Sequence, residues 1–125
     1  MKFHMRQTFA LSLILFVGFL TGCSKTRSQT ALDPAKIPET INKTFANAPD
    51  ATKETASNYV SAFQSQDTSG AFMQLEQMNQ DPNLTPQQRQ VVAKAMQTTF
   101  VKLQAAAQNG DTAAQATMHS YLSAR

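Results

Sequence analysis

Hydrophobic and polar residues divide the chain into three stretches of different pattern. Residues 9–20 form an almost unbroken apolar run, and residues 24–36 are polar, with Leu32 as their single large apolar residue. From Ile37 onward, apolar residues return every three or four positions, which is the spacing of one face of an α-helix. No segment alternates between apolar and polar residues for long enough to predict a strand. The pattern therefore predicts an all-α fold over residues 37–125, preceded by a disordered tether.

Proline and capping residues predict where the first helices begin and end. Pro38 opens a short helix that ends before Pro49, and Asp50 is expected to be the N-cap of the next helix. That second helix has an apolar stripe at positions i, i+3, i+4 and i+7, namely Ala56, Tyr59, Val60 and Phe63. Residues 67–70 interrupt the pattern, and a third, shorter helix then carries Phe72, Leu75 and Met78.

The clearest helix start is a capping box. Thr85 is predicted to be the N-cap, Pro86 occupies the first helical position, and Gln88 completes the box. This long helix should end at Asn109 and Gly110, because glycine readily adopts the left-handed conformation that follows many helices. Its core-facing residues fall within an arc of about 140°; they are Val92, Ala95, Met96, Thr99, Phe100, Leu103, Ala106 and Ala107.

Asp111 is predicted to cap a last helix, whose inward residues are Ala114, Met118, Tyr121 and Leu122. Because only a tight turn separates this helix from the long one, the two are expected to form an antiparallel helical hairpin. The earlier helices then pack across the apolar faces of the hairpin. The fold prediction is an all-α, small helical bundle of about four helices that includes this C-terminal antiparallel hairpin.

The amino-terminal region follows a different order. Lys2 and Arg6 precede the apolar run, and the small residues Thr21 and Gly22 follow it, directly before Cys23. This basic, apolar, small-residue order is typical of an export signal. An uncleaved membrane helix is the alternative, but the apolar run of about 12 residues is shorter than the roughly 20 that a spanning helix needs. The pattern favours a secretory signal.

Leu20, Thr21, Gly22 and Cys23 resemble the lipobox of bacterial lipoproteins. The resemblance implies that the thiol of Cys23 is joined to diacylglycerol, that the signal is cut just before this residue, and that fatty acyl groups complete the anchor. Two or three acyl chains, at about 0.8 kcal/mol per buried methylene, hold a protein at a membrane permanently. The chain is then divided into a signal peptide (1–22), an acylated tether (23–36) and a helical domain (37–125).

The identity of residue 24, a serine, indicates which membrane holds the anchor. In enterobacterial lipoproteins, an aspartate directly after the acylated cysteine is the inner-membrane retention signal, so a serine at this position resembles the outer-membrane case. The expected location is the cell envelope, lipid-anchored to the outer membrane and facing the periplasm.

Composition narrows the classes of function. A chain of 125 residues is long enough for one small domain, and its only cysteine, Cys23, leaves no internal disulfide. The formal charge of +3 falls to +1 when Lys2 and Arg6 leave with the signal. A nearly neutral domain gives no indication of nucleic-acid binding.

The residues that catalysis requires are scarce. His119 is the only histidine after the signal, and no second cysteine exists, which excludes Cys/His arrangements and weakens Ser/His ones. Asp50 and Glu54 form the nearest carboxylate pair, but they lie in the first turn of a helix, where negative charge stabilises the dipole. The sequence therefore predicts a protein that is not an enzyme and has no cofactor beyond the lipid on Cys23.

Two groups of residues resemble metal sites. Asp81, Asn83 and Thr85 resemble the start of an EF-hand loop, but Pro86 stands where glycine is needed and Val92 where the bidentate glutamate belongs. A turn followed by a helix cap explains the same residues.

Copper(I) is the other metal considered, because thioether and imidazole groups suit this soft ion. The residues concerned are Met73, Met78, Met96, Met118 and His119. The methionines lie on or beside the apolar stripes, where methionine commonly fills gaps. A small-ligand or copper-binding pocket between the hairpin and the shorter helices stays an alternative.

The rear side of the long helix carries unexpected apolar residues. Val101 lies about 160° from the centre of the core arc, with Val91 and Ala105 toward the same side. These three residues form the candidate partner seam, which competes with the interpretation that they are scattered surface residues. The same helix is locally basic through Arg89, Lys94 and Lys102, which suits either anionic head groups, an acidic partner or a simple solvated face.

The sequence thus favours a non-catalytic, membrane-anchored lipoprotein of protein-binding or structural type. Its expected partners are the membrane, another envelope protein or a second copy in a homodimer. One version resembles the pilotins of secretion systems, which are small helical lipoproteins that assist envelope machinery, and this comparison rests on size, anchor and helix content.

Overall fold

The computed structural model describes residues 30–125, so the predicted signal, the lipobox with Cys23, and tether residues 24–29 lie outside the described residues. The described part contains helices and no strand, which confirms the predicted all-α fold. No helix in this range combines the length and the apolar character that crossing a bilayer requires. In chain order the elements are η1 (Pro34–Lys36), α1 (Ile37–Thr44), α2 (Asp50–Gln64), α3 (Thr68–Asn79), α4 (Pro86–Gln108) and α5 (Thr112–Ser123).

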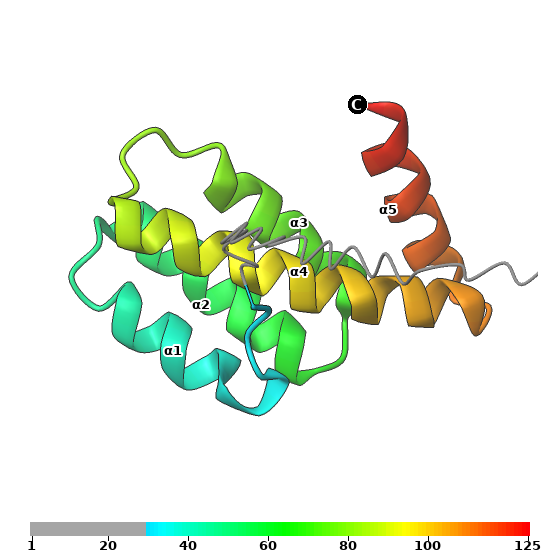
Figure 1. Ribbon diagram of the computed structural model, residues 1–125, viewed down its shortest axis with the longest axis horizontal. Helices are drawn as coiled ribbons and strands as arrows, with labels where there is room; N and C mark the ends of the chain where they lie inside the picture. The colour runs from blue at the N-terminus through cyan, green and yellow to red at the C-terminus, as the bar shows by residue number, and fades with distance from the viewer. Residues whose placement is uncertain (1–29) are drawn as a thin grey trace, which may run out of the picture.

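The first four α-helices form a bundle of two layers. α1 contacts both α2 and α4, and α3 contacts the same two helices. As a result, α1 and α4 make one layer, and α2 and α3 make the other (Figure 1). This arrangement is the small helical bundle that the sequence predicts.

The first core cluster fills the space between these four helices. Its buried residues are Ile37, Ile41, Phe45, Ala48, Ala56, Tyr59, Val60, Ala71, Leu75, Met78, Leu84, Val92 and Ala95. Inside the bundle, the hydroxyl groups of Tyr59 and Thr99 share a hydrogen bond of 3.0 Å, and neither side chain is exposed. Each buried hydroxyl therefore has a partner, which avoids the cost of an unsatisfied polar group.

The capping signals place α4 and α5 as predicted. The Thr85 hydroxyl accepts a hydrogen bond from the Gln88 backbone N–H (3.2 Å), and the Gln88 side chain accepts one from the Thr85 N–H (2.9 Å). Gly110 follows α4 with a φ of 93°, a conformation that glycine adopts readily. Asp111 then caps α5 by accepting a hydrogen bond from the Ala114 N–H (3.0 Å).

Two earlier boundaries differ from the sequence prediction. Asp50 is the first residue of α2 and not its N-cap, because the chain already turns at Pro49, which makes no side-chain capping bond. Gly70 lies inside α3, and the carboxylate of Asp67 caps that helix by accepting a hydrogen bond from the Gly70 N–H (2.8 Å). The stretch 67–70 is thus a cap and a first turn.

The folded unit begins before residue 37, because the end of the predicted tether is part of it. Leu32 packs against the first core cluster, and its carbonyl accepts a hydrogen bond from the Thr98 hydroxyl of α4 (2.7 Å). Asp33 caps η1 by accepting a hydrogen bond from the Ala35 N–H (3.0 Å). These contacts fix the place at which the chain reaches the bundle.

α4 and α5 pair as an antiparallel hairpin that opens toward the end of the chain. The Gln115 side chain donates a hydrogen bond to the Ala107 carbonyl (2.9 Å), and the ring of Tyr121 lies 5.8 Å from that of Phe100. In each pair the two residues are about equally far from the turn in sequence, as antiparallel pairing requires. In Figure 1, α5 nevertheless rises away from α4, and Leu122, predicted to face inward, is 57% exposed. A second core cluster, with Phe72, Leu103 and Ala114 buried, holds α5 in place.

Candidate docking groove

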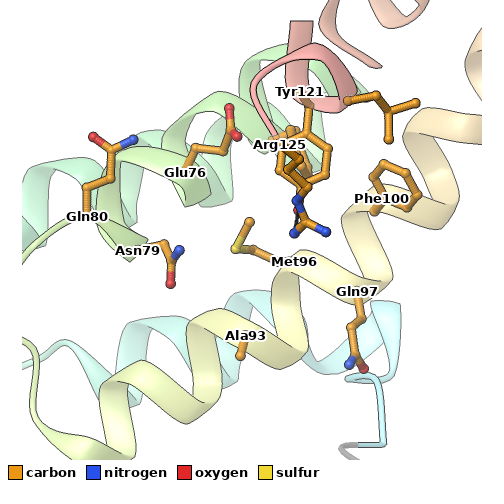
Figure 2. A pocket seen from close by; sticks show the side chains of 11 residues that line it. Glu76, Asn79, Gln80, Ala93, Met96, Gln97, Phe100, Tyr121 and Arg125 are labelled. Atoms are coloured by element: carbon orange, nitrogen blue, oxygen red, sulfur yellow. Dashed lines mark hydrogen bonds between the residues drawn. The ribbon is translucent and has the colours of Figure 1, made fainter. Parts of the chain in front are cut away.

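A groove of about 670 Å³ lies where α5 diverges from α3 and α4. Figure 2 shows side chains from all three helices around it. The lining residues are Phe72, Glu76, Asn79, Gln80, Ala93, Met96, Gln97, Phe100, Tyr121, Leu122 and Arg125. The groove lies beside Tyr121, through which the end of α5 contacts α3 and α4.

Three aromatic rings form the floor of the groove, one from each helix. The ring of Tyr121 meets that of Phe72 edge to face, with centroids 5.0 Å apart, and Phe100 lies 5.9 Å from Phe72. Phe72 is buried, whereas Phe100 and Tyr121 are only partly buried. Edge-to-face pairs of this kind are favourable beyond the area they bury, so the rings both hold α5 and present apolar surface.

The rim of the groove is polar and carries both signs of charge. The guanidinium of Arg125 lies 4.6 Å from the centre of the Tyr121 ring and donates a hydrogen bond to its hydroxyl. Glu76 enters from α3, and Figure 2 shows the amide-bearing residues Asn79 and Gln97 around the same opening. Arginine stacked on an aromatic face keeps donors available for a ligand. Amide side chains supply both donors and acceptors.

The sequence predicts the helices that make this groove, but it does not show that their residues meet there. Phe100 and Tyr121 were assigned to the core stripes of their own helices, and Phe72 to that of α3. The periodicity of one helix cannot show that three stripes meet at an open end. The groove does lie between the hairpin and a shorter helix, where the ligand-binding alternative places a pocket.

The candidate seam residues on α4 differ in exposure. Val101 is 63% exposed and Ala105 is exposed, whereas Val91 is partly buried and packs against the first core cluster. Val91 also borders a second, polar groove between α1 and α4, which Lys36 and Lys43 line. The structure therefore leaves Val101 and Ala105 as open surface and places Val91 beside α1.

The three basic residues of α4 point to different surroundings. The Arg89 side chain donates a hydrogen bond to the Leu84 carbonyl (3.3 Å), at the start of the helix. The ammonium of Lys102 lies 5.4 Å from the centre of the Phe63 ring of α2. Lys94 is partly exposed, one turn before Thr98. These cations do not form one narrow stripe.

The oxygen atoms of the EF-hand-like segment hold a turn together. Asp81 accepts one hydrogen bond from the Asn83 N–H and one from the Thr52 hydroxyl of α2, both at 2.9 Å. The backbone hydrogen bond from Asn83, supported by that from Thr52, lowers the pKa of the Asp81 carboxyl. Thr85 is occupied by the capping box. These contacts account for the residues as a turn and a cap.

The residues of the copper alternative are dispersed. Met78 is buried in the first core cluster, Met118 packs against the second, and Met73 is 54% exposed on α3. His119 is exposed on α5. Within residues 30–125, no group of three or more His, Cys, Asp or Glu side chains is arranged to hold a metal ion.

Tyr59 and Asp50 are titratable side chains that make contacts with other residues of the fold. Burial raises the pKa of Tyr59 to about 12, against a smaller lowering effect of its hydrogen bond with Thr99. Asp50 pairs with Lys53 (3.8 Å) in the first turn of α2, and Glu54 is exposed in the same helix. His119 and Ser120 are both exposed neighbours on α5. Adjacent helical positions point about 100° apart, which does not suit a catalytic pair.

Comparisons with models of protein families, with curated proteins and with solved structures found no match to this chain. The class that the described residues define is therefore a structural one: a small all-α bundle with a splayed terminal hairpin.

Proposed function

We propose that this protein is a non-catalytic lipoprotein, anchored through Cys23 to the periplasmic side of the outer membrane, that docks another envelope protein. The observation that carries the docking role is the groove between α3, α4 and α5, with its aromatic floor and polar rim. The anchor is supported by the lipobox-like residues 20–23.

The chemistry of the groove favours a peptide segment as its occupant. Aromatic residues, methionine and arginine are enriched in protein interfaces, and Phe100, Met96 and Arg125 all line the groove. The amide groups of Asn79 and Gln97 can pair with the backbone of a bound segment. The matching occupant is an amphipathic segment that places apolar side chains on the rings and presents a basic group to Glu76 and an acidic group to Arg125.

A small apolar ligand is a second candidate because of the groove's size. The volume of about 670 Å³ falls within the roughly 300–1,000 Å³ of small-molecule pockets. The open form and the number of polar side chains on the rim favour the peptide segment, since small ligands are usually enclosed on most sides.

Two exposed apolar residues provide a matched test of docking. Leu122 lines the groove and is 57% exposed, whereas Met73 is 54% exposed and is absent from the lining. A photo-crosslinking amino acid at Gln97 should capture the partner in intact envelopes. Leu122→Asp should lower that capture by about tenfold or more, since it puts a charge in the apolar contact. Met73→Asp should leave it unchanged.

The outcomes separate the candidates. Equal capture in both variants would exclude the groove as the docking site. Absence of captured protein, with a small molecule that copurifies with wild type and is lost from Leu122→Asp, would favour the ligand-binding alternative. The anchor is tested separately by mass spectrometry of the mature protein, which should begin at Cys23 and carry diacylglycerol; an unmodified thiol would contradict it.

A further inference from the structure

Charge is distributed unequally between the two layers of the bundle. α4 carries Arg89, Lys94 and Lys102 and no acidic residue. The opposite layer and its turns, residues 50–81, carry five acidic residues against Lys53 alone, a net charge of −4. In the segment 33–49, two lysines balance two acidic residues. The layer of α1 and α4 is therefore basic, and the layer of α2 and α3 is acidic.

The chain reaches the bundle at the middle of the basic layer. The Leu32 carbonyl is bound by the Thr98 hydroxyl (2.7 Å), and the first part of the described chain crosses in front of α4 in Figure 1. Lys94 and Lys102 lie four residues before and after Thr98, and Val101 lies three residues after it. Residues three and four apart share a helix face, so both lysines and the exposed Val101 surround this contact.

We propose that the residues around the Leu32–Thr98 contact, namely Lys94, Val101 and Lys102, lie against an anionic lipid surface. The proposal rests on the proposed anchor at Cys23, which is nine residues from Leu32. Nine residues reach at most about 30 Å. A domain of this size has a radius of about 16 Å, so turning its acidic layer to the bilayer would require the chain to pass roughly 40 Å around it. The tether therefore excludes an orientation with the acidic layer facing the membrane, and among the remaining orientations the positive charge favours the basic side.

The side chains on this face suit a lipid surface. Val101, 63% exposed, can enter the apolar edge of the head-group region. The stems of Lys94 and Lys102 are long enough for their ammonium groups to reach the phosphates, once that of Lys102 leaves the Phe63 ring, from which it lies 5.4 Å in the structure. Lys36 and Lys43 lie on the same layer, beside Glu39.

The acidic groups of this layer do not remove its positive charge. Asp33 holds the cap of η1, and Glu39 stands between Lys36 and Lys43. With Lys94 and Lys102 added, cations exceed anions on this side. The docking groove opens on another side of α4, through Ala93 and Met96, so it stays accessible when the basic face contacts lipid.

Lysine acetylation can map the face in contact with lipid. A chain beginning at Cys23 is coupled through its only thiol to a maleimide-bearing lipid, which supplies the anchor whether or not the natural protein is acylated. Vesicles of phosphatidylethanolamine and phosphatidylglycerol are compared with vesicles of phosphatidylcholine alone. The acetylation rate of each lysine is read by mass spectrometry, with Lys53 of the opposite layer as the internal control.

On the anionic vesicles, the acetylation rates of Lys36, Lys94 and Lys102 should fall to about one fifth or less of their rates on the neutral vesicles. The reason is that each cation near an anionic surface gains about a factor of five in binding. Lys53 should not change, and high salt should restore all rates. In the double variant Lys94→Gln/Lys102→Gln on anionic vesicles, the acetylation rate of Lys36 should rise to the rate measured on neutral vesicles. The variant Lys53→Gln should leave the protection of Lys36 intact.

Three results would overturn the proposal. Equal rates on both vesicles would show that the basic face does not contact anionic lipid. Equal slowing of Lys53 would show that the domain has no preferred side. Protection of Lys94 and Lys102 that persists on neutral vesicles and grows with protein density would assign the face to a second copy of the chain. The finding that Cys23 of the natural protein is not acylated would contradict the proposed function, but it would not affect this surface measurement.

Discussion

The two core clusters of this short chain differ in how completely helices enclose them. The first cluster is surrounded by α1, α2, α3 and α4, and its central residues, such as Tyr59 and Leu75, have no exposed surface. The second cluster has Phe72, Leu103 and Ala114 as its buried members, with partly exposed rings around them. α3 and α4 take part in both. The difference arises at α5, which rises away from α4 and leaves the second cluster beside an open groove.

This contrast separates the part of the domain that is fully enclosed from the part that carries the proposed docking site. A core enclosed on all sides packs at high density and unfolds as a unit, while a segment with few buried contacts opens at lower free energy. α5 is such a segment, because its only buried residue is Ala114. The groove lies along this weakly covered edge. The groove proposed as the docking site is thus beside the α-helix that has the fewest buried residues.

The largest expected effect compares the same substitution in both clusters. Leu75 and Leu103 are both fully buried, the first in the first cluster and the second in the second. Leu75→Ala should lower the free energy of unfolding by about 4 kcal/mol, and Leu103→Ala by about 3 kcal/mol, because side chains beside an open groove can relax into the space left. Urea denaturation of both variants measures the difference.

A smaller loss for Leu75→Ala than for Leu103→Ala would contradict the view that the first cluster is the more tightly enclosed. Leu122→Ala serves as the control, because its side chain is largely exposed and should change the free energy of unfolding by less than about 0.5 kcal/mol.

High pH should destabilise the first cluster through Tyr59. Burial raises the pKa of this hydroxyl from 10.0 to about 12. The neutral form is favoured in the folded state, so the full stabilisation is present below the unfolded pKa and is lost as the pH rises through the folded one. The expected loss over this window is about 2–3 kcal/mol. Urea denaturation at about pH 9 and about pH 12 measures it.

Tyr59→Phe is the control for this titration. The variant cannot ionise at position 59, so it should lose less stability between the two pH values than the wild type does. It will be less stable at the lower pH, because the Thr99 hydroxyl loses its buried partner. An equal pH-dependent loss in both proteins would show that other groups cause the alkaline unfolding.

Local signals made some elements predictable from the sequence. Thr85 and Gln88 form the predicted capping box, and Gly110 and Asp111 separate α4 from α5 as expected. These predictions succeed because each depends on hydrogen bonds or backbone angles within a few residues. The prediction of Asp50 as the N-cap is wrong, because either Pro49 or Asp50 can precede the first turn and a shift of one residue changes the energy little.

Long-range packing explains what the sequence did not show. Leu122 continues an apolar helical stripe, yet it is exposed near the end of α5, a helix that rises away from α4. That divergence depends on how Phe72, Phe100 and Tyr121 pack, and these residues come from three helices. Likewise, the contact of Leu32 with Thr98 joins residues 66 positions apart and incorporates a polar segment that composition alone predicts to be disordered.

The smallest expected effect compares two aspartate caps, one in each region. Asp67 caps α3 within the bundle, and Asp111 caps α5 beside the groove. Replacing either with alanine should cost about 1 kcal/mol, the usual value of an N-cap side chain. The two substitutions should destabilise different parts of the domain. Asp67→Ala lowers the free energy of global unfolding, because α3 belongs to both clusters. Asp111→Ala mainly accelerates amide hydrogen exchange within α5, since that helix can detach while the first cluster stays folded. If Asp111→Ala instead lowered global stability and left exchange in α5 unchanged relative to α4, the two clusters would unfold as one unit, and the groove would be as rigid as the bundle.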